Sequence, residues 1–189
     1  QITEVYVSPG ISLRNKIFSK AKKINIPLYR DLELYSRISK KKKIIAVTGT
    51  NGKSTTVRLI SDLLNNDKKV FLGGNYGPAL LDFYNNKDYS KTHVVELSSF
   101  QLESSPSFKP YISVLLNISN DHLDRYDSIN SYAKEKEKIF KYNKNGYRII
   151  SLDDSYSVKI YKKYFNKKKY FIPISINKKI KNGIYIYDH

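Results

Sequence analysis

The sequence predicts an α/β fold built on a parallel sheet, and three observations lead to it. Short apolar runs alternate with helical patterns along the chain, which is typical of consecutive β-α-β units. Most motifs with charged or reactive side chains come directly after apolar runs, where the strands of such a sheet end and ligands bind. The chain has 189 residues, 40% of them hydrophobic, which is enough for one domain with a buried core.

The first forty residues predict a small unit ahead of the main sheet. EVYVS at 4–8 indicates a strand that ends in a Pro-Gly turn, and a helix over 16–24, a strand at 27–29 and a helix over 31–38 follow. Four consecutive lysines then occupy 40–43. Like charges in a row repel one another and favour solvated backbone, so we expect a linker or domain boundary there. The alternative is that the lysines only begin the next strand.

After the lysines, expected strands alternate with expected helices. The strands are at 44–49, 69–74, 93–99, 111–119, 147–154 and 170–174, and the helices are at 57–66, 128–140 and 155–164. In the first of these helices, Leu59 with Leu63 and Ile60 with Leu64 stand at helical spacing. Strands joined through helices give a doubly wound sheet with right-handed crossovers.

The charge of the chain does not by itself indicate a nucleic-acid partner. The sequence has 34 Lys and Arg against 17 Asp and Glu, a formal net charge of +17, but 28 of the basic residues are Lys and 6 are Arg. Lys, Asn, Ile and Tyr share A/T-rich codons, so codon bias explains the excess of lysine. A surface selected for nucleic acid would favour Arg, which makes forked contacts to phosphates and bases. We therefore expect a solvated basic surface and no nucleic-acid binding.

Composition also argues against several other classes of protein. No apolar stretch approaches the roughly 20 residues of a membrane span, and no signal peptide follows the first residue. The chain has no Cys, which excludes a disulfide framework, a thiolate nucleophile and cysteine-bound zinc. This composition is consistent with a reducing compartment, so we expect a cytoplasmic protein with no membrane partner. We also expect a monomer.

The strongest local motif is GTNGKST at 49–55, which follows an expected strand and opens a helix. Glycines allow backbone N–H groups to converge on phosphate oxygens, the helix N-terminus adds partial positive charge, and Lys53 would reach the terminal phosphates. The Ser54 hydroxyl suits a Mg²⁺ ligand. The generic phosphate-loop pattern has Gly where this chain has Val47, so a turn without a ligand is the alternative. The candidate nucleotide-binding residues are Gly49, Thr50, Asn51, Gly52, Lys53, Ser54 and Thr55.

Two further polar groups follow strands. Glu96 ends HVVE, where a carboxylate at the carboxyl edge of the sheet suits a Mg²⁺ that bridges phosphates. NISNDHLDRY, after the fourth strand, places His122 beside Asp121 and Asp124. His is an ordinary metal ligand when a neighbouring acid orients its ring. The alternatives are a solvated Glu at a strand end and a structural His.

On the helix expected at 128–140, Lys136 stands in the apolar stripe. The other positions of this stripe are Ile129, Tyr132, Ala133, Ile139 and Phe140. A buried ammonium costs several kcal/mol unless it is paired or chemically altered. The alternative is that Lys136 snorkels, with its four-carbon stem buried and its charge in water. The pattern alone does not separate these two possibilities.

Taken together, these motifs resemble the Mur ligase family. The segments VSPGI at 7–11, GTNGKST at 49–55, GGNYG at 73–77, ELSSFQLE at 96–103 and NDHLDRY at 120–126 match the family in order and spacing. GTNGKST marks only the wider superfamily, which includes folylpolyglutamate synthases. ELSSFQLE and NDHLDRY are more specific to the members that add D-glutamate. The resemblance covers nearly the whole chain and weakens after about Asp154.

The resemblance implies an ATP-dependent, amide-forming ligase of cytoplasmic peptidoglycan synthesis. In such a ligase the γ-phosphoryl group of ATP passes to the carboxylate of UDP-MurNAc-L-alanine, and the amine of D-glutamate attacks the resulting acyl phosphate. Mg²⁺ at two sites would help to neutralise the phosphate charge, because phosphoryl transfer depends on positioning and charge neutralisation. The alternative is another Mur ligase or a ligase similar to folylpolyglutamate synthase.

The resemblance also implies roles for individual residues. Lys53 matches the phosphate-loop lysine, and Ser54 and Glu96 match the ligands of one Mg²⁺. His122 and Lys136 match ligands of a second Mg²⁺, with Lys136 carbamylated. The candidate catalytic residues are therefore Lys53, His122 and Lys136. The candidate metal ligands are Ser54, Glu96, His122 and Lys136, and the candidate substrate-binding residues are Ser8, Asn75, Ser98 and Gln101.

Finally, the resemblance divides the chain into two parts. Residues 1–40 match the C-terminal part of a Rossmann-like, UDP-binding N-terminal domain, and residues 41–189 match an incomplete central ATP-binding domain. The family's C-terminal domain has no counterpart here. Because the chain starts at Gln1 and stops inside the β-like run GIYIYDH, we expect a fragment that ligates nothing alone.

Overall fold

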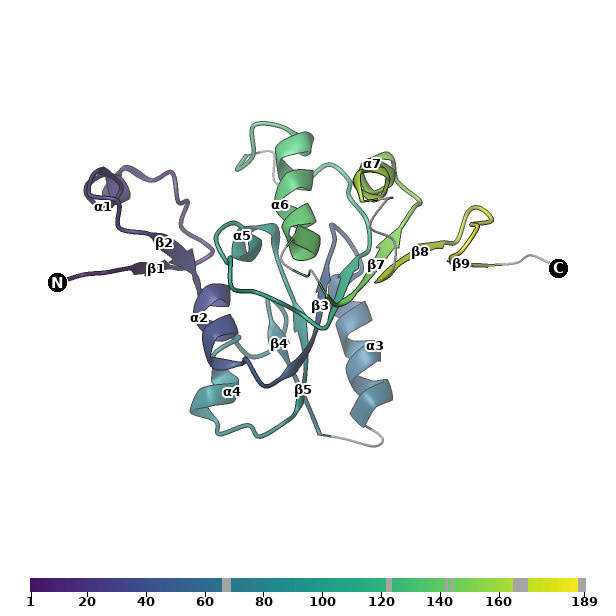
Figure 1. The fold of residues 1–189 in the computed structure, drawn as a ribbon, viewed down its shortest axis with the longest axis horizontal. Helices are drawn as coiled ribbons and strands as arrows, with labels where there is room; N and C mark the ends of the chain where they lie inside the picture. The colour runs from purple at the N-terminus through teal and green to yellow at the C-terminus, as the bar shows by residue number, and fades with distance from the viewer. Residues whose placement is uncertain (66–68, 122–123, 142, 144, 165–169, 187–189) are drawn as a thin grey trace.

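A seven-stranded, entirely parallel sheet forms the centre of the chain in the computed structural model (Figure 1). The structure describes residues 1–65, 69–121, 124–141, 143, 145–164 and 170–186. In spatial order the strands are β4 (Val70–Gly74), β5 (Thr92–Glu96), β3 (Lys43–Thr48), β6 (Ile112–Leu115), β7 (Tyr147–Ser151), β8 (Phe171–Ser175) and β9 (Ile184–Tyr185). The predicted parallel α/β fold is therefore confirmed.

Three of the predicted strands run three or more residues past the carboxyl ends of the observed ones. The residues in excess, at 97–99, 116–119 and 152–154, lie beyond the carboxyl ends of β5, β6 and β7, in loops except for Ser99, which begins helix α5. These loops carry much of the polar sequence that the motifs contain, because the sheet's carboxyl edge is where side chains leave the regular ladder.

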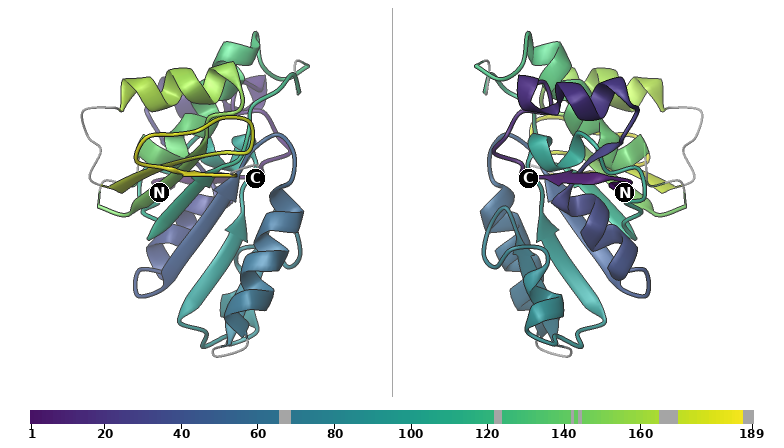
Figure 2. Two further views of the ribbon diagram at one scale, coloured as in Figure 1. Left: turned by 90° about the vertical axis from the view of Figure 1, so that its right-hand side faces the viewer. Right: turned by 90° about the vertical axis from the view of Figure 1, so that its left-hand side faces the viewer.

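Helices cover the two faces of the sheet unequally (Figure 2). The helices of the sheet's two faces are α2 (Asp31–Ile38), α3 (Lys53–Asn65), α4 (Asp82–Asn85), α5 (Ser99–Leu102), α6 (Ile129–Lys141) and α7 (Ser155–Lys163). Only α3 contributes to the smaller apolar cluster, and the other five contribute to the larger one on the opposite face. Alternate residues of β3 serve the two clusters, as the period of two along a strand requires: Ala46 in one, Val47 in the other.

Helix α3 begins at Lys53, earlier than expected, because the phosphate-loop turn leads directly into it. Of the four apolar residues that indicated this helix, Ile60 and Leu64 pack against the smaller cluster. Leu59 and Leu63 are instead 58% and 73% exposed. Val57 and Ser61 are the buried residues of α3. No helix in the part of the chain that the structure describes is long and apolar enough to cross a membrane.

The first residues form a separate two-stranded parallel sheet. Strand β1 (Val5–Val7) pairs with β2 (Leu28–Arg30), and the 3-10 helix η1 (Lys16–Phe18) and helix α1 (Ser19–Lys23) lie between them in sequence. Helix α2 follows β2 directly and places two buried side chains in the larger core. Strand β3 starts at the last of the four lysines. The division into residues 1–40 and 41–189 stays a prediction.

Candidate active site

Four segments that are distant in sequence meet at the carboxyl edge of three neighbouring strands. Strand β3 lies between β5 and β6, and the pairs Val47–Glu96 and Thr48–Leu115 set their register. Since all three strands are parallel, the loops that follow them leave from one edge of the sheet. These loops and helix α6, which crosses the same region, carry most of the predicted site residues.

The phosphate loop is hydrogen-bonded to Asn117, a residue to which the sequence analysis gave no role. The side-chain oxygen Oδ1 of Asn117 accepts hydrogen bonds from the backbone N–H groups of Asn51 at 2.8 Å and Thr50 at 3.1 Å. The Asn117 carbonyl also accepts from the Thr50 N–H at 2.9 Å. Gly52 has φ +78°, a left-handed conformation that suits glycine. The position of Asn117 directly beyond β6 was the one available signal.

Lys53 lies at the start of α3, over its own loop. Its Nζ donates a hydrogen bond to the Thr50 carbonyl at 2.7 Å. The side chain is half-buried, so the ammonium sits at the rim of the loop rather than in the core. A 13-residue helix that begins at this point directs unpaired N–H groups and partial positive charge toward the loop.

Ser54, Asn75 and Glu96 form one hydrogen-bonded group. The Ser54 hydroxyl donates to Glu96 Oε2 at 2.7 Å, and Asn75 Nδ2 donates to Glu96 Oε1 at 2.7 Å. Gly74 makes this approach possible, because a Cβ built there would lie 2.3 Å from the Glu96 carbonyl oxygen. Its φ of +115° also excludes most other residues. The structure thus brings together Ser54 and Glu96, which were predicted to share one Mg²⁺, and adds Asn75, which was predicted as a substrate contact.

Lys136 is buried, with 1% of its surface exposed, which excludes the snorkelling alternative. Its Nζ donates to the Gly49 carbonyl at 2.7 Å and lies 4.6 Å from the centre of the Tyr132 ring. Within the described part of the chain, Lys136 forms no ion pair with a carboxylate. Burial, with the nearby charge of Lys53 as a smaller cause, lowers the pKa of Lys136 to about 7.

Tyr132 is a second side chain that the sequence analysis did not assign to the site. It lies one helical turn before Lys136 and is 1% exposed. Its hydroxyl is 3.3 Å from the Thr50 hydroxyl, and burial raises its pKa. The Tyr132 ring therefore separates Lys136 from water while its hydroxyl touches the phosphate loop. The sequence signal for Tyr132 was its position in the same apolar helical stripe as Lys136.

The predicted substrate-binding residues lie in three places. Ser98 and Gln101 form the capping box of α5: Ser98 Oγ accepts from the Gln101 N–H at 3.3 Å, and Gln101 Oε1 accepts from the Ser98 N–H at 3.1 Å. Asn75 belongs to the Glu96 group. Ser8 lies in the turn after β1, which accepts hydrogen bonds from Arg30 at the end of β2 and from Arg125 in the loop beyond β6. The substrate roles of these four residues stay predictions.

His122 lies outside the described residues, so its predicted role as a metal ligand stays a prediction. Among the residues that the structure does describe, no three His, Cys, Asp or Glu side chains cluster as a metal site would require. The described candidates for metal ligation are therefore Ser54, Glu96 and Lys136.

Comparison with known proteins gives a consistent set of relatives. The Mur ligase middle domain matches residues 47–188. A UDP-N-acetylmuramoylalanine–D-glutamate ligase of Rickettsia prowazekii is 42% identical over 191 residues, which cover 99% of this chain and 42% of that protein. The corresponding ligase of Caldanaerobacter subterraneus is 39% identical over 184 residues, 96% of this chain and 40% of its own. The chain thus spans about two fifths of the length of these curated relatives.

Solved structures with a similar fold are more distant in sequence. The MurF ligase of Thermotoga maritima, solved in complex with ADP, has a TM-score of 0.60 at 17% identity, with 94% of this chain and 51% of that chain covered. The UDP-N-acetylmuramate:L-alanyl-gamma-D-glutamyl-meso-diaminopimelate ligase of Neisseria meningitides has a TM-score of 0.62 at 12% identity, over 96% and 63%. At these identities the likeness concerns the fold.

Proposed function

This chain belongs to the Mur ligase family, and we propose that the protein containing it joins D-glutamate to UDP-MurNAc-L-alanine with ATP. The observation that carries the proposal is the 42% identity to a ligase of that name along 99% of the chain. Because the chain spans about two fifths of that relative, the activity would belong to the complete protein. We expect it to act in the cytoplasm on these small-molecule substrates, as a monomer, without nucleic acid or a membrane as partner.

The proposed reaction has two steps. A carboxylate oxygen of UDP-MurNAc-L-alanine attacks the γ-phosphorus of ATP, so that an acyl phosphate forms and ADP leaves. The amine of D-glutamate then attacks the acyl carbon, loses a proton and expels phosphate, which leaves an amide. The protein's contribution to the first step is to position the reactants and neutralise charge.

The phosphate loop would hold the ATP phosphates. Its backbone N–H groups at Thr50 and Asn51 donate to Asn117 in this structure, so they would exchange that partner for phosphate oxygens when an anion binds. The Lys53 ammonium would leave the Thr50 carbonyl and contact the terminal phosphates, which attract it more strongly.

The group formed by Ser54, Asn75 and Glu96 suits a hard cation. Mg²⁺ prefers oxygen ligands, and here a hydroxyl and a carboxylate oxygen already lie 2.7 Å apart beside the phosphate loop. Mg²⁺ bound there would neutralise charge on the β- and γ-phosphates. Asn75, which holds the other oxygen of the Glu96 carboxylate, would orient that carboxylate.

Lys136 would ligate a second Mg²⁺ as a carbamate, together with His122. Only a neutral amine reacts with carbon dioxide, and burial provides one near neutral pH because it lowers the pKa of Lys136 to about 7. The new bond joins Nζ to carbon, one proton goes to solvent, and the side chain becomes an anion. The carbamate keeps one N–H, so the hydrogen bond to the Gly49 carbonyl can persist.

The remaining assignments concern the substrate and the domains. The residues that would line the path of the muramoyl substrate are Ser8, Asn75, Ser98 and Gln101. Asn75 contacts Glu96, the last residue of β5, and the capping box of α5 follows β5 directly. Residues 1–40 would end the UDP-binding domain, and residues 41–189 would form most of the ATP-binding domain.

A substrate comparison tests the proposed function. The complete protein is incubated with ATP, Mg²⁺ and UDP-MurNAc-L-alanine, and phosphate release is measured with D-glutamate, with L-glutamate and with no amino acid. We expect release that depends on D-glutamate and yields a UDP-linked product heavier by one glutamyl residue. Phosphate release with a folate and L-glutamate instead would assign the protein to the folylpolyglutamate synthase branch and contradict the proposal.

A further inference from the structure

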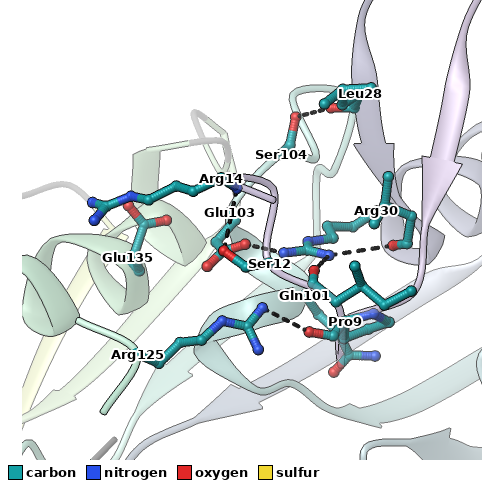
Figure 3. A network of polar contacts seen from close by, with 12 residues as sticks. Pro9, Ser12, Arg14, Leu28, Arg30, Gln101, Glu103, Ser104, Arg125 and Glu135 are labelled. Carbon is teal, nitrogen blue, oxygen red and sulfur yellow. Dashed lines mark hydrogen bonds and ion pairs between the residues drawn. The ribbon is translucent and has the colours of Figure 1, made fainter. Parts of the chain in front are cut away.

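Two arginine side chains hold the turn that follows β1 by donating hydrogen bonds to its backbone carbonyl oxygens (Figure 3). Arg30 Nη1 donates to the carbonyls of Ser8 at 2.7 Å and Ile11 at 2.9 Å. Arg125 Nη1 donates to the Gly10 carbonyl at 3.1 Å, and its Nη2 donates to the Pro9 carbonyl at 3.1 Å. Arg30 Nη1 also lies 3.4 Å from the Val7 carbonyl, so two guanidinium groups contact five consecutive carbonyls, those of residues 7–11.

The two arginines reach this turn from different parts of the chain. Arg30 ends β2, the partner strand of β1, so it belongs to the same small sheet as the turn. Arg125 follows β6 and belongs to the edge of the large sheet where the candidate active site lies. Arg125 therefore ties the turn to the loop beyond β6, whereas Arg30 shapes the turn and joins it to the end of α5 through its ion pair with Glu103.

Rings behind Arg125 continue to the phosphate loop. The Arg125 guanidinium carbon lies 4.3 Å from the centre of the Phe100 ring, and Phe100 stacks on Tyr126 with ring centres 5.7 Å apart and planes at 17°. The Tyr126 ring lies 5.5 Å from that of Tyr132, which contacts both Lys136 and Thr50. Aromatic side chains have few rotamers and pack closely, so this row of rings connects Arg125 rigidly to the phosphate loop.

We propose that Arg125 is a positioning residue, which holds the 8–11 turn at a fixed place relative to Lys136 and the phosphate loop. This inference rests on the proposed function, in which Ser8 of the turn lines the path of the muramoyl substrate. The turn and the phosphate loop then bind two reactants that must meet. An error of about 1 Å in such a placement can reduce turnover by about 100-fold.

Arginine suits this task for a geometric reason. Its planar guanidinium presents parallel N–H donors to two carbonyls while its face stacks on a ring. A lysine in its place would keep the charge but offer no planar fork. Arg14, an exposed arginine near the turn, pairs instead with Asp127 at 3.1 Å, with both side chains about three-quarters exposed. Such a pair contributes little, so Arg14 is a matched control.

The test uses the complete protein and its steady-state kinetics. For Arg125→Gln we expect kcat to fall at least about tenfold and the KM for UDP-MurNAc-L-alanine to rise, with the KM for ATP unchanged. Arg125→Lys should lie between this variant and the parent. Phe100→Leu, which removes the ring behind the guanidinium, should change the same parameters in the same direction by less. Arg14→Gln should stay within about twofold of the parent in every parameter.

Hydrogen exchange provides a readout that does not depend on activity. The Ile11 N–H donates to the Ser8 carbonyl within the turn, and we expect its exchange to accelerate in Arg125→Gln but not in Arg14→Gln, with phosphate-loop amides unaffected. Unchanged exchange at Ile11 would overturn the proposal whether or not the protein is a ligase. A KM increase with parental kcat would also overturn it, since that pattern indicates direct contact with substrate. If the parent shows no D-glutamate-dependent phosphate release but exchange at Ile11 is accelerated in Arg125→Gln, the proposed function is contradicted. The role of Arg125 in positioning the turn is then still supported.

Discussion

Two of the cations that are buried in the described part of the chain differ in their surroundings. Arg30, at the seam between the small sheet and the large one, is 0% exposed, and Lys136, beside the phosphate loop, is 1% exposed. The Arg30 guanidinium binds backbone carbonyls of the 8–11 turn and forms an ion pair with Glu103. Lys136 has one backbone carbonyl at 2.7 Å, the Thr48 hydroxyl at 3.5 Å and the face of an aromatic ring.

The difference teaches that burial of a charge does not by itself indicate function, whereas burial without a carboxylate partner favours a chemical role. A buried cation with a carboxylate and several carbonyls is compensated and stabilises the contact between two segments. A buried amine without a carboxylate partner shifts its protonation instead, and this is the state in which it can react. We therefore interpret Arg30 as a structural residue and Lys136 as a residue that takes part in the chemistry of the site.

The largest expected effect is that of Lys136→Met in the complete protein. Methionine fills the stripe with a similar volume and carries no charge, so we expect parental or higher thermal stability. Turnover should fall by about 1,000-fold or more, because the carbamate that would hold the second Mg²⁺ cannot form. Paired measurements of melting temperature and of D-glutamate-dependent phosphate release check this. Parental turnover would place Lys136 with Arg30 among the structural residues.

The matching change at the seam is Arg30→Met, for which we expect the opposite outcome. Glu103 would lose its buried partner, and the free energy of unfolding should fall by about 3–5 kcal/mol. Urea denaturation of this chain measures the loss. The double change of Arg30→Met with Glu103→Gln should recover part of it, since no uncompensated charge then remains. A stable Arg30→Met chain would show that the seam does not depend on this ion pair.

Lys53→Ala removes the cation that lies over the phosphate loop and whose charge also helps to lower the pKa of Lys136. We expect the dissociation constant for ATP with Mg²⁺ to rise by about 100-fold, because a charged donor to the phosphates is lost. Titration calorimetry of the parent and the variant gives both constants. Lys53→Arg, which keeps the charge, is the control and should lose less. Equal affinities in all three proteins would remove Lys53 from the nucleotide site.

The smallest expected effect concerns His93, a buried group that is neutral for structural reasons. His93 is 0% exposed, its Nδ1 lies 2.8 Å from the Tyr35 hydroxyl, and Phe83 packs at 4.8 Å between ring centres. Burial is the main reason that its pKa falls to about 4 from 6.5. Because the folded state resists protonation, the stability that neutral His93 allows is present above about pH 6.5 and is lost as pH falls toward 4.

Between pH 7 and pH 5 this loss should be about 2 kcal/mol. His93→Gln keeps a hydrogen-bonding side chain and does not titrate, so the same pH change should destabilise it by about 2 kcal/mol less. Urea denaturation at the two pH values gives the difference. Equal losses in the parent and in the variant would mean that His93 does not control acid stability.

Much of the architecture follows from local pattern, because strands and amphipathic helices depend on near neighbours in sequence. Helix α2 begins and ends where expected, at Asp31 and Ile38. Helix α5 has four residues, too few for a helical period, and was missed. Its signal was the spacing of Ser98 and Gln101, a capping-box pattern that we interpreted only as substrate contacts.

The site was predictable only in part for a related reason. Lys136 could be identified because its helix alone defines the apolar stripe. The role of Asn117 depends on β6 lying beside β3, and the role of Arg125 depends on where the 8–11 turn rests. Such contacts depend on strand order and long-range packing, which no local pattern in one sequence encodes.

The most direct test of the interpretation of Lys136 is a carbon-13 experiment on the complete protein. The protein is equilibrated with ¹³C-bicarbonate at slightly alkaline pH, where the Lys136 amine is mostly neutral, and its carbon spectrum is recorded beside that of Lys136→Met. We predict a protein-bound carbamate resonance in the parent that is absent from the variant. Identical spectra without such a resonance would contradict the assignment of Lys136 as a carbamylated metal ligand.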